Sequence, residues 1–237
     1  MSFLLSSGVD RPAIEYVKLS RDRLDETIDM MVNCFFSREP MFSVLSGLAG
    51  GAPEDHRAWL SASLPEWHWD GSCLALDAGT GCVIGASMCA VYGVDEEEPC
   101  WRLSETKSET GRAYCSFADE IGQRFDPFES LNVPTVFENV LLVVDPRYCG
   151  LGVASELCRR SSVECAARSG APVSLCFCTS STTRRIYERL GFTFACEIPY
   201  AGSALERVVD VTSILPHRAC SVMYKWMSNA STSSTSS

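Results

Sequence analysis

An apolar strand, a turn with two glycines and a helix follow one another in this chain, and this order can bind an anion. Residues 136–144 are strongly apolar, Gly150 and Gly152 follow them, and the predicted helix runs to about residue 169. Backbone N–H groups at the start of a helix point toward a bound anion, and glycines let it approach the main chain closely. Arg147 adds a positive charge beside the turn. The segment therefore predicts a phosphate site.

Two common phosphate motifs do not match this turn. A nucleoside-triphosphate loop needs the sequence Gly-Lys-Ser/Thr, which is absent. The dinucleotide fingerprint needs a third glycine or an alanine where Ser155 stands. The turn therefore points to a phosphate-containing ligand of another class.

The composition is that of a globular protein with an acidic surface. The 237 residues include 20 Lys plus Arg and 30 Asp plus Glu, which gives a net charge of −10, and 46% are hydrophobic. An acidic balance argues against a nucleic-acid partner, which normally meets a basic stripe. We find no apolar run of about 18 residues and no signal peptide, so we expect a cytoplasmic protein without a membrane partner.

The cysteines and histidines do not form a metal-binding pattern. The 13 cysteines are an odd number scattered along the chain, and Cys176-Phe177-Cys178 is the one close spacing among them. The three histidines, His56, His68 and His217, lie far apart. We therefore expect reduced, mostly buried thiols and no metal ion.

Hydrophobic periodicity and turn residues predict alternating strands and helices in a single domain. We expect this domain at 12–227, after an N-terminal extension at 1–11 and before a disordered Ser/Thr-rich tail at 228–237. The predicted strands are 14–19, 74–76, 82–92, 136–144, 173–178, 192–198 and 220–227, and the predicted helices are 21–38, 53–64, 112–125, the one that ends near 169, and 182–190.

Two motifs resemble the GNAT acetyltransferases. Arg147-x-x-Gly150-x-Gly152-x-Ala154 resembles the Q/R-x-x-G-x-G/A pyrophosphate loop of that superfamily, and Tyr187-Glu188-Arg189-Leu190-Gly191-Phe192 resembles its Y-E-x-x-G-F segment. The resemblance implies an α/β fold with a mixed, mostly antiparallel sheet that is flanked by helices and splayed at the central strands. It also implies acetyl-CoA as co-substrate.

Three further segments resemble the insect-type arylalkylamine (dopamine) N-acetyltransferases. Phe35-Phe36-Ser37-Arg38-Glu39-Pro40-Met41 looks like their F-F-x-x-E-P-L segment, residues 178–183 are similar to their C-S-S-x-x-S stretch, and Pro216-His217 with Val222-Met223 is similar to their last strand. The chain departs from that group where Thr179 and Thr183 replace active-site serines. It departs again at Tyr187, where insect members often have an apolar residue.

The resemblance assigns the cofactor to the end of the central strand and to the glycine turn. Their backbone would align the pantetheine arm and the diphosphate of acetyl-CoA, and one N–H group would polarise the acetyl carbonyl. The residues implied are Leu142, Val143, Val144, Arg147, Tyr148, Cys149, Gly150, Leu151, Gly152, Val153 and Ala154.

The reaction that the resemblance implies needs a base and an acid. An alkylamine has a pKa near 10 and is mostly protonated at pH 7, so a site must remove a proton before nitrogen attacks the thioester. Glu39 is the first candidate base, unless it is a surface residue at a helix end, and Glu138 on the central strand is its rival. Tyr187 is the candidate acid, or else a core residue of its helix. Thr179 and Thr183 would relay protons or bind substrate, or else cap local structure.

The functional prediction is a monomeric acetyl-CoA-dependent N-acetyltransferase for small arylalkylamines such as dopamine, tyramine, octopamine, serotonin or tryptamine. Aromatic residues would stack on an aryl ring or a cation in the amine pocket, or else each of them packs in the core. The candidates are Trp59, Trp67, Trp69, Trp101, Phe125 and Phe128. The alternatives are a GNAT enzyme for a polyamine, an amino acid or a protein N-terminus, and a catalytically silent CoA-binding fold.

Overall fold

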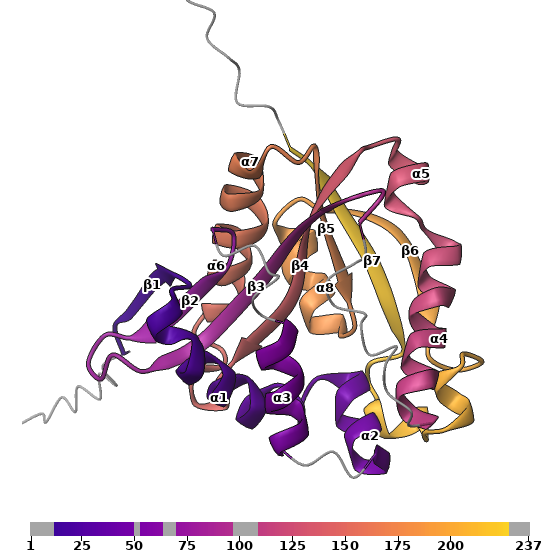
Figure 1. Cartoon of the computed structure of the whole chain (residues 1–237), viewed down its shortest axis with the longest axis horizontal. Coiled ribbons are helices and arrows are strands. Elements are labelled where there is room, and N and C mark those ends of the chain that lie inside the picture. The colour runs from indigo at the N-terminus through magenta and orange to yellow at the C-terminus, as the bar shows by residue number, and fades with distance from the viewer. Residues whose placement is uncertain (1–11, 50–52, 64–69, 97–108, 228–237) are drawn as a thin grey trace, which may run out of the picture.

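A seven-stranded mixed sheet forms the centre of the protein in the computed structural model, which describes residues 12–49, 53–63, 70–96 and 109–227 (Figure 1). The spatial order is β1-β2-β3-β4-β5-β7-β6, and β4 and β5 are parallel while the other neighbours are antiparallel. The strands are β1 Ile14–Lys18, β2 Cys73–Asp77, β3 Val83–Gly93, β4 Thr135–Val144, β5 Val173–Cys178, β6 Thr193–Pro199 and β7 Ala219–Trp226. The predicted mixed, mostly antiparallel sheet is confirmed. The predicted extension at 1–11 and tail at 228–237 lie outside the described residues.

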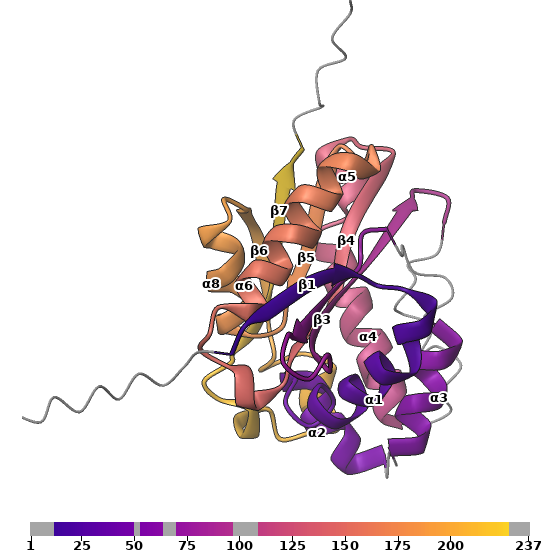
Figure 2. The same ribbon diagram turned by 90° about the vertical axis from the view of Figure 1, so that its left-hand side faces the viewer.

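Helices cover both faces of this sheet (Figure 2). One face carries α1, α2 and α4, with α3 against α1, and the other carries α8 and a long helix in which α6 continues through the π-helical segment η5 into α7. Their bounds are α1 Leu24–Cys34, α2 Pro40–Ala49, α3 Pro53–Ser63, α4 Glu109–Arg124, α5 Pro127–Leu131, α6 Val153–Cys158, η5 Arg159–Cys165, α7 Ala166–Ser169 and α8 Ser181–Arg189.

Side chains alternate between the two faces of the sheet along each strand, and this explains why an apolar layer lies on each face. On β2, Leu74 packs toward α1, while Cys73 and Ala75 pack toward the α6–α7 helix. Successive side chains of a strand point to opposite faces, so a strand that is apolar throughout buries both of them. Val136 and Phe137 of β4 are both fully buried for this reason.

The middle of β4 is where the sheet opens. Met88 of β3 faces Leu141, but Cys89 faces Asn139, so Val140 is an extra residue on β4, as in a β-bulge. On its other side β4 pairs with β5 only over Val136–Asn139, opposite Val173–Cys176. Residues 141–144 thus have backbone partners on β3 but none on β5, and Val140 has none on either strand. This is the splay at the central strands that the sequence analysis predicted.

The region between α1 and α2 differs from the prediction. A helix was expected to continue to Arg38 and to stop at Glu39-Pro40, but α1 ends at Cys34 and α2 begins at Pro40. The N–H groups of Arg38 and Glu39 both donate to the carbonyl of Phe35, which closes a turn between the two helices. Proline fits the first position of a helix because it lacks an N–H that would have no partner there. Pro40 therefore starts a helix here.

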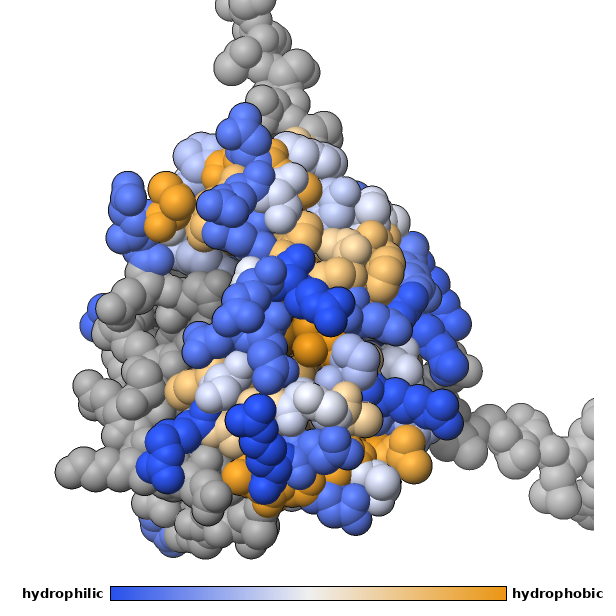
Figure 3. Space-filling model, turned by 90° about the vertical axis from the view of Figure 1, so that its right-hand side faces the viewer, coloured by the Kyte–Doolittle hydropathy of each residue, from blue (hydrophilic) through white to orange (hydrophobic). Residues whose placement is uncertain are grey.

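The described residues contain no helix that is long and apolar enough to cross a membrane. On the side of α4 and α5 the surface is mostly hydrophilic, with apolar atoms in small separate patches (Figure 3).

Candidate functional site

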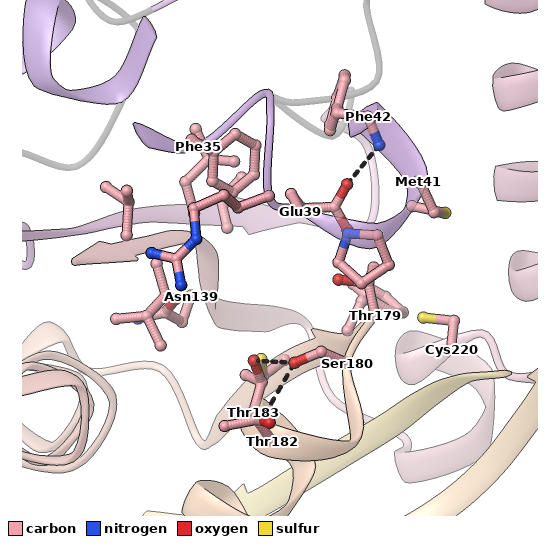
Figure 4. A pocket seen from close by; sticks show the side chains of 18 of the residues that line it. Phe35, Glu39, Met41, Phe42, Asn139, Thr179, Ser180, Thr182, Thr183 and Cys220 are labelled. Atoms are coloured by element: carbon pink, nitrogen blue, oxygen red, sulfur yellow. Dashed lines mark hydrogen bonds between the residues drawn. The ribbon is translucent and has the colours of Figure 1, made fainter. Parts of the chain in front are cut away.

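A cavity of about 310 Å³ opens where β4 and β5 part. Its walls come from the turn between α1 and α2, the unpaired half of β4, the end of β5 and the start of α8 (Figure 4). Four predicted catalytic residues line it: Glu39, Thr179, Thr183 and Glu138. Five residues of the predicted cofactor segment line it too, namely Leu142, Val143, Val144, Cys149 and Ala154, whereas Arg147, Tyr148, Gly150, Leu151, Gly152 and Val153 lie outside the lining.

Glu39 precedes α2 and turns its carboxylate back onto that helix. Its Oε2 accepts a hydrogen bond from the N–H of Phe42 at 2.6 Å, and its carbonyl accepts one from Ser43 at 2.9 Å (Figure 4). This is the bonding of a helix N-cap, with glutamate in place of the usual serine or aspartate. The second oxygen, Oε1, is buried and has no hydrogen-bond partner among the described residues. A buried carboxylate oxygen without a partner is costly, so it marks a place that accepts a ligand proton or a water molecule.

The environment of Glu39 raises its pKa. Burial is the largest cause because it disfavours the charged form. The Phe42 N–H, the nearby Thr179 hydroxyl and the Met41 N–H offset part of the rise. The Thr179 hydroxyl thus lies near the carboxylate without completing a hydrogen bond to Oε1. A raised carboxylate pKa brings a general base closer to the pH at which it works.

Glu138 lies deeper, on the paired half of β4. Its side chain is only 2% exposed, and its Oε2 accepts a hydrogen bond from the Tyr92 hydroxyl at 2.6 Å. It lines the same cavity as Glu39. The structure thus brings both candidate bases to one cavity, with different partners.

Hydroxyl groups gather where β5 ends and α8 begins. Ser180 caps α8, since its Oγ accepts from the Thr183 N–H at 3.0 Å, and it lies 2.8 Å from the Thr183 hydroxyl (Figure 4). Ser180 and Thr182 also line the cavity beside Thr179 and Thr183. The capping role therefore falls to Ser180, and the two threonine hydroxyls stand at the cavity wall.

Tyr187, the candidate acid, lies outside the cavity lining. Its side chain is fully buried in the core on the α6 side, and its hydroxyl lies 3.1 Å from the Ser162 hydroxyl in η5. Burial raises its pKa well above the usual value. This position corresponds to the alternative weighed in the sequence analysis, a core residue of its helix.

Asn139 is a cavity residue that the sequence analysis did not single out. It is 3% exposed, and its side-chain amide donates to the hydroxyls of Ser87 and, at 3.1 Å, Ser161. Ser161 belongs to η5, and π-helical segments inside helices are frequent at functional sites. These bonds fix the residue before the β4 bulge. A polar residue inside an apolar strand was the one available signal for it.

His217 is a second cavity residue to which the sequence analysis gave no role. Its Nδ1 accepts from the N–H of Ser181 at 3.2 Å, which leaves Nε2 to carry the proton of the neutral ring. Burial lowers the pKa of His217. The imidazole is therefore neutral at pH 7 and offers one N–H donor.

The predicted glycine turn follows β4 directly. Gly150 and Gly152 have φ values of 79° and 85°, which side chains rarely adopt. A Cβ built at either position meets no other atom within 4 Å, so packing does not demand these glycines. The first N–H groups of the helix that begins at Val153 have no acceptor within the helix. The turn thus has the open backbone that a phosphate contact needs.

A second cavity of about 310 Å³ adjoins the first, because Ile121 and Phe177 line both. Phe125 and Phe128, predicted for the amine pocket, line this second cavity. Of the four predicted tryptophans, Trp67, Trp69 and Trp101 and the side chain of Trp59 lie outside the described residues.

Groups of three or more His, Cys, Asp or Glu that could hold a metal ion do not occur among the described residues.

Several solved structures with a similar fold are acetyltransferases. Arylalkylamine N-acetyltransferase 2 from Aedes aegypti is 24% identical, with a TM-score of 0.72 over 91% of this chain and 99% of that chain. A Drosophila melanogaster polyamine N-acetyltransferase that forms N-acetylagmatine is 15% identical, with a TM-score of 0.71 over 91% of this chain and 100% of that one. The Salmonella typhimurium protein yncA, solved with its cofactor acetyl-CoA, is 12% identical, with a TM-score of 0.52 over 94% and 99%.

These similarities establish the fold: the chain has the fold of the GNAT acetyltransferases, as the two sequence motifs predicted. No family model and no curated protein matches the sequence.

Proposed function

We propose that the chain is an acetyl-CoA-dependent N-acetyltransferase that acetylates the primary amine of small arylalkylamines. The observation that supports this most strongly is Glu39, whose buried Oε1 has no partner in the described part of the chain and which lines a cavity bordered by the unpaired half of β4. The cavity thus combines a carboxylate able to take a proton with strand backbone able to hold an extended thioester arm. The similarity to acetyltransferase structures agrees with this assignment.

The proposed reaction is a direct attack. The amine enters as an ammonium ion and passes a proton through a water molecule to Glu39. The nitrogen lone pair then forms a bond to the carbonyl carbon, and the C–S bond breaks with its electrons leaving on sulfur. A second proton moves from nitrogen to sulfur, and the hydroxyls of Thr179 and Thr183 are the cavity groups that would relay it. A β4 N–H would stabilise the oxyanion.

The cofactor part of the proposal rests on β4 and the glycine turn. The unpaired edge at residues 140–144 would pair with the pantetheine arm, and the turn would bind the diphosphate. We expect Gly152→Val to raise the KM for acetyl-CoA about tenfold or more, because a β-branched residue at a φ of 85° displaces the backbone.

The matched control for Gly152 is Gly202→Val. Gly202 has almost the same φ, 84°, and the same free space around a Cβ, but it lies in the loop after β6 and not in the turn that follows β4. Steady-state kinetics of both variants separates backbone strain from cofactor binding. Equal KM values for Gly152→Val and the wild type would refute the assignment of the turn.

The apolar wall opposite the hydroxyls supports the proposed acceptor class. Phe35, Phe42 and Tyr114 line it, and the Phe42 and Tyr114 ring centroids are 5.3 Å apart. Such a wall suits the ring of an arylalkylamine, whose amine then points to Glu39. A thiol-release assay with acetyl-CoA and a panel of amines tests this. We expect tyramine, dopamine and serotonin to give the highest kcat/KM.

The second cavity supports one alternative acceptor class, the polyamines. Glu96 and Asp126 line it together with Phe125 and Phe128, so it combines carboxylates with aromatic rings that attract cations. A diamine with one nitrogen at Glu39 would extend its second cation toward this cavity. Higher kcat/KM for agmatine or spermidine than for tyramine, together with a loss of that preference in Glu96→Gln, would replace the first proposal. CoA binding without turnover of any amine would support the silent alternative.

A further inference from the structure

Two arginines flank the glycine turn, and they differ in how their charge is used. Arg147, the cation that the sequence predicted for the phosphate, forms a bidentate ion pair with Asp145. Its Nη2 lies 2.6 Å from Oδ2, and its Nε lies 3.1 Å from Oδ1. This contact holds the pKa of Asp145 below its usual value, so the carboxylate stays charged at neutral pH. The pair is close to neutral as a unit, and it offers a phosphate little net charge.

Arg38 approaches the same turn from the opposite wall of the cavity. It belongs to the turn between α1 and α2, and its Nη1 and Nη2 lie 3.8 and 3.9 Å from the Cys149 sulfur. Both Arg38 and Cys149 are exposed and line the cavity. No carboxylate among the residues that the structure describes lies within ion-pair distance of Arg38. Its guanidinium is therefore not held in an ion pair by a described carboxylate, although its charge contributes to the lowered pKa of Asp145.

A cation beside the glycine turn would offset the repulsion between a bound diphosphate and this acidic protein. The chain has a net charge of −10, and two carboxylates, Glu39 and Glu138, line the cavity itself. A ligand with a diphosphate meets repulsion from such a protein unless a nearby cation offsets it. The guanidinium also has the planar donor fork that matches two phosphate oxygens.

We propose that Arg38, rather than Arg147, is the side chain that binds the diphosphate of acetyl-CoA, facing Gly150 and Gly152 across the opening of the cavity. This inference rests on the proposed function. It makes Arg38 a cofactor-binding residue that the pyrophosphate-loop motif does not contain. Because Glu39 is the next residue, one short turn would hold both the phosphate contact and the proposed base.

The test compares thioesters with and without phosphate. Arg38→Ala is assayed with acetyl-CoA and with S-acetyl-N-acetylcysteamine, which has the same reactive group and no phosphate. We expect the KM for acetyl-CoA to rise about tenfold to a hundredfold and the kcat/KM for the short thioester to stay at the wild-type value. Arg38→Lys, which keeps the charge and loses the fork, should recover part of the affinity. Arg207→Ala, an exposed arginine outside the cavity lining, is the matched control.

The results that would contradict the role of Arg38 can be told apart. An unchanged KM for acetyl-CoA in Arg38→Ala overturns the inference. An equal loss with both thioesters also overturns it, because Arg38 would then act through the Glu39 turn. Dephospho-CoA decides between phosphate groups: if Arg38→Ala weakens CoA but not dephospho-CoA in calorimetry, Arg38 binds the 3′-phosphate and the diphosphate assignment is wrong. If wild-type protein binds CoA without turnover, the proposed function fails while calorimetry still tests Arg38.

Discussion

Glu39 and Glu138 border one cavity, yet their carboxylates are in opposite situations. Glu138 is held inside the sheet, with the Tyr92 hydroxyl 2.6 Å from its Oε2. Glu39 lies where a helix begins, with one oxygen on the Phe42 N–H and the other buried without a partner from the residues that the structure describes. A carboxylate whose hydrogen bonds are made inside the protein is part of its structure. One with a missing partner is available to a ligand. The comparison therefore favours Glu39 as the base.

The largest expected effect is on turnover when Glu39 is neutralised. Glu39→Gln keeps an oxygen for the Phe42 N–H and cannot take a proton, so kcat should fall about 10²–10⁴-fold, the usual contribution of a general base. The KM for acetyl-CoA should not change. Glu129→Gln, an exposed glutamate in the first turn of α5, is the control. Turnover at the wild-type level in Glu39→Gln would remove Glu39 from the mechanism.

The pH dependence of kcat/KM in Glu39→Gln provides a second test of the role of Glu39. The pKa of Glu39 is raised by burial, and only its ionised form accepts a proton, so wild-type kcat/KM should decline as the pH falls through that raised pKa. Glu39→Gln should lose this acidic limb. A limb that persists unchanged in the variant would belong to another group, with Glu138 the first to examine.

A smaller effect is expected at Glu138. Glu138→Gln keeps an acceptor for the Tyr92 hydroxyl, and we expect kcat to fall less than about tenfold, well short of the loss of a base. Tyr92→Phe, which removes the donor and leaves the carboxylate, completes the pair of variants. If Glu138→Gln abolishes turnover and Glu39→Gln does not, the two roles are reversed.

The smallest effect concerns stability, and its sign follows from the pKa. Because the folded-state pKa of Glu39 is above its unfolded value, folding favours the protonated form, and this contribution is lost as the pH rises through the raised pKa. Above that pH the buried charge destabilises the wild type. Glu39→Gln should therefore raise the Tm, and each 1 kcal/mol gained would shift it by about 2–4 °C for a chain of this size. The gain should vanish near pH 4 in thermal melts, and a loss of stability at pH 7 would contradict this prediction.

The strands were largely predictable from the sequence, but the turn between α1 and α2 was not. The apolar runs 136–144 and 173–178 have the length of a strand and are apolar throughout, which predicts buried strands. The structure places them as β4 and β5. The apolar spacing that ends at Phe35 and Phe36 continues past the true end of α1, so periodicity alone extended that helix to Arg38. Pro40 is compatible with both a helix end and a helix start, and hydrogen bonds to the Phe35 carbonyl decide between them.

Residue types in the site were easier to predict than their surroundings. The motifs predicted Glu39, Thr179 and Thr183, and the structure places all three at one cavity. The missing partner of Glu39 Oε1 depends on packing among distant segments, which no local pattern contains. The ion pair of Arg147 with Asp145 could have been predicted, since the two residues are two positions apart. The position of Arg38 beside Cys149, without an ion pair to a described carboxylate, could be seen only in the folded structure.

The short pairing between β4 and β5 has a consequence for dynamics. Between β4 and β5 only Val136–Asn139 joins the two halves of the sheet, and beyond Asn139 the main-chain amides on that side have no partner on β5. Such amides exchange hydrogen with solvent faster than those of the joined part. A ligand laid along this seam would act as an additional strand between the two halves. Its binding should therefore register as slowed deuterium uptake at residues 140–144, far more than at Val136 or Phe137.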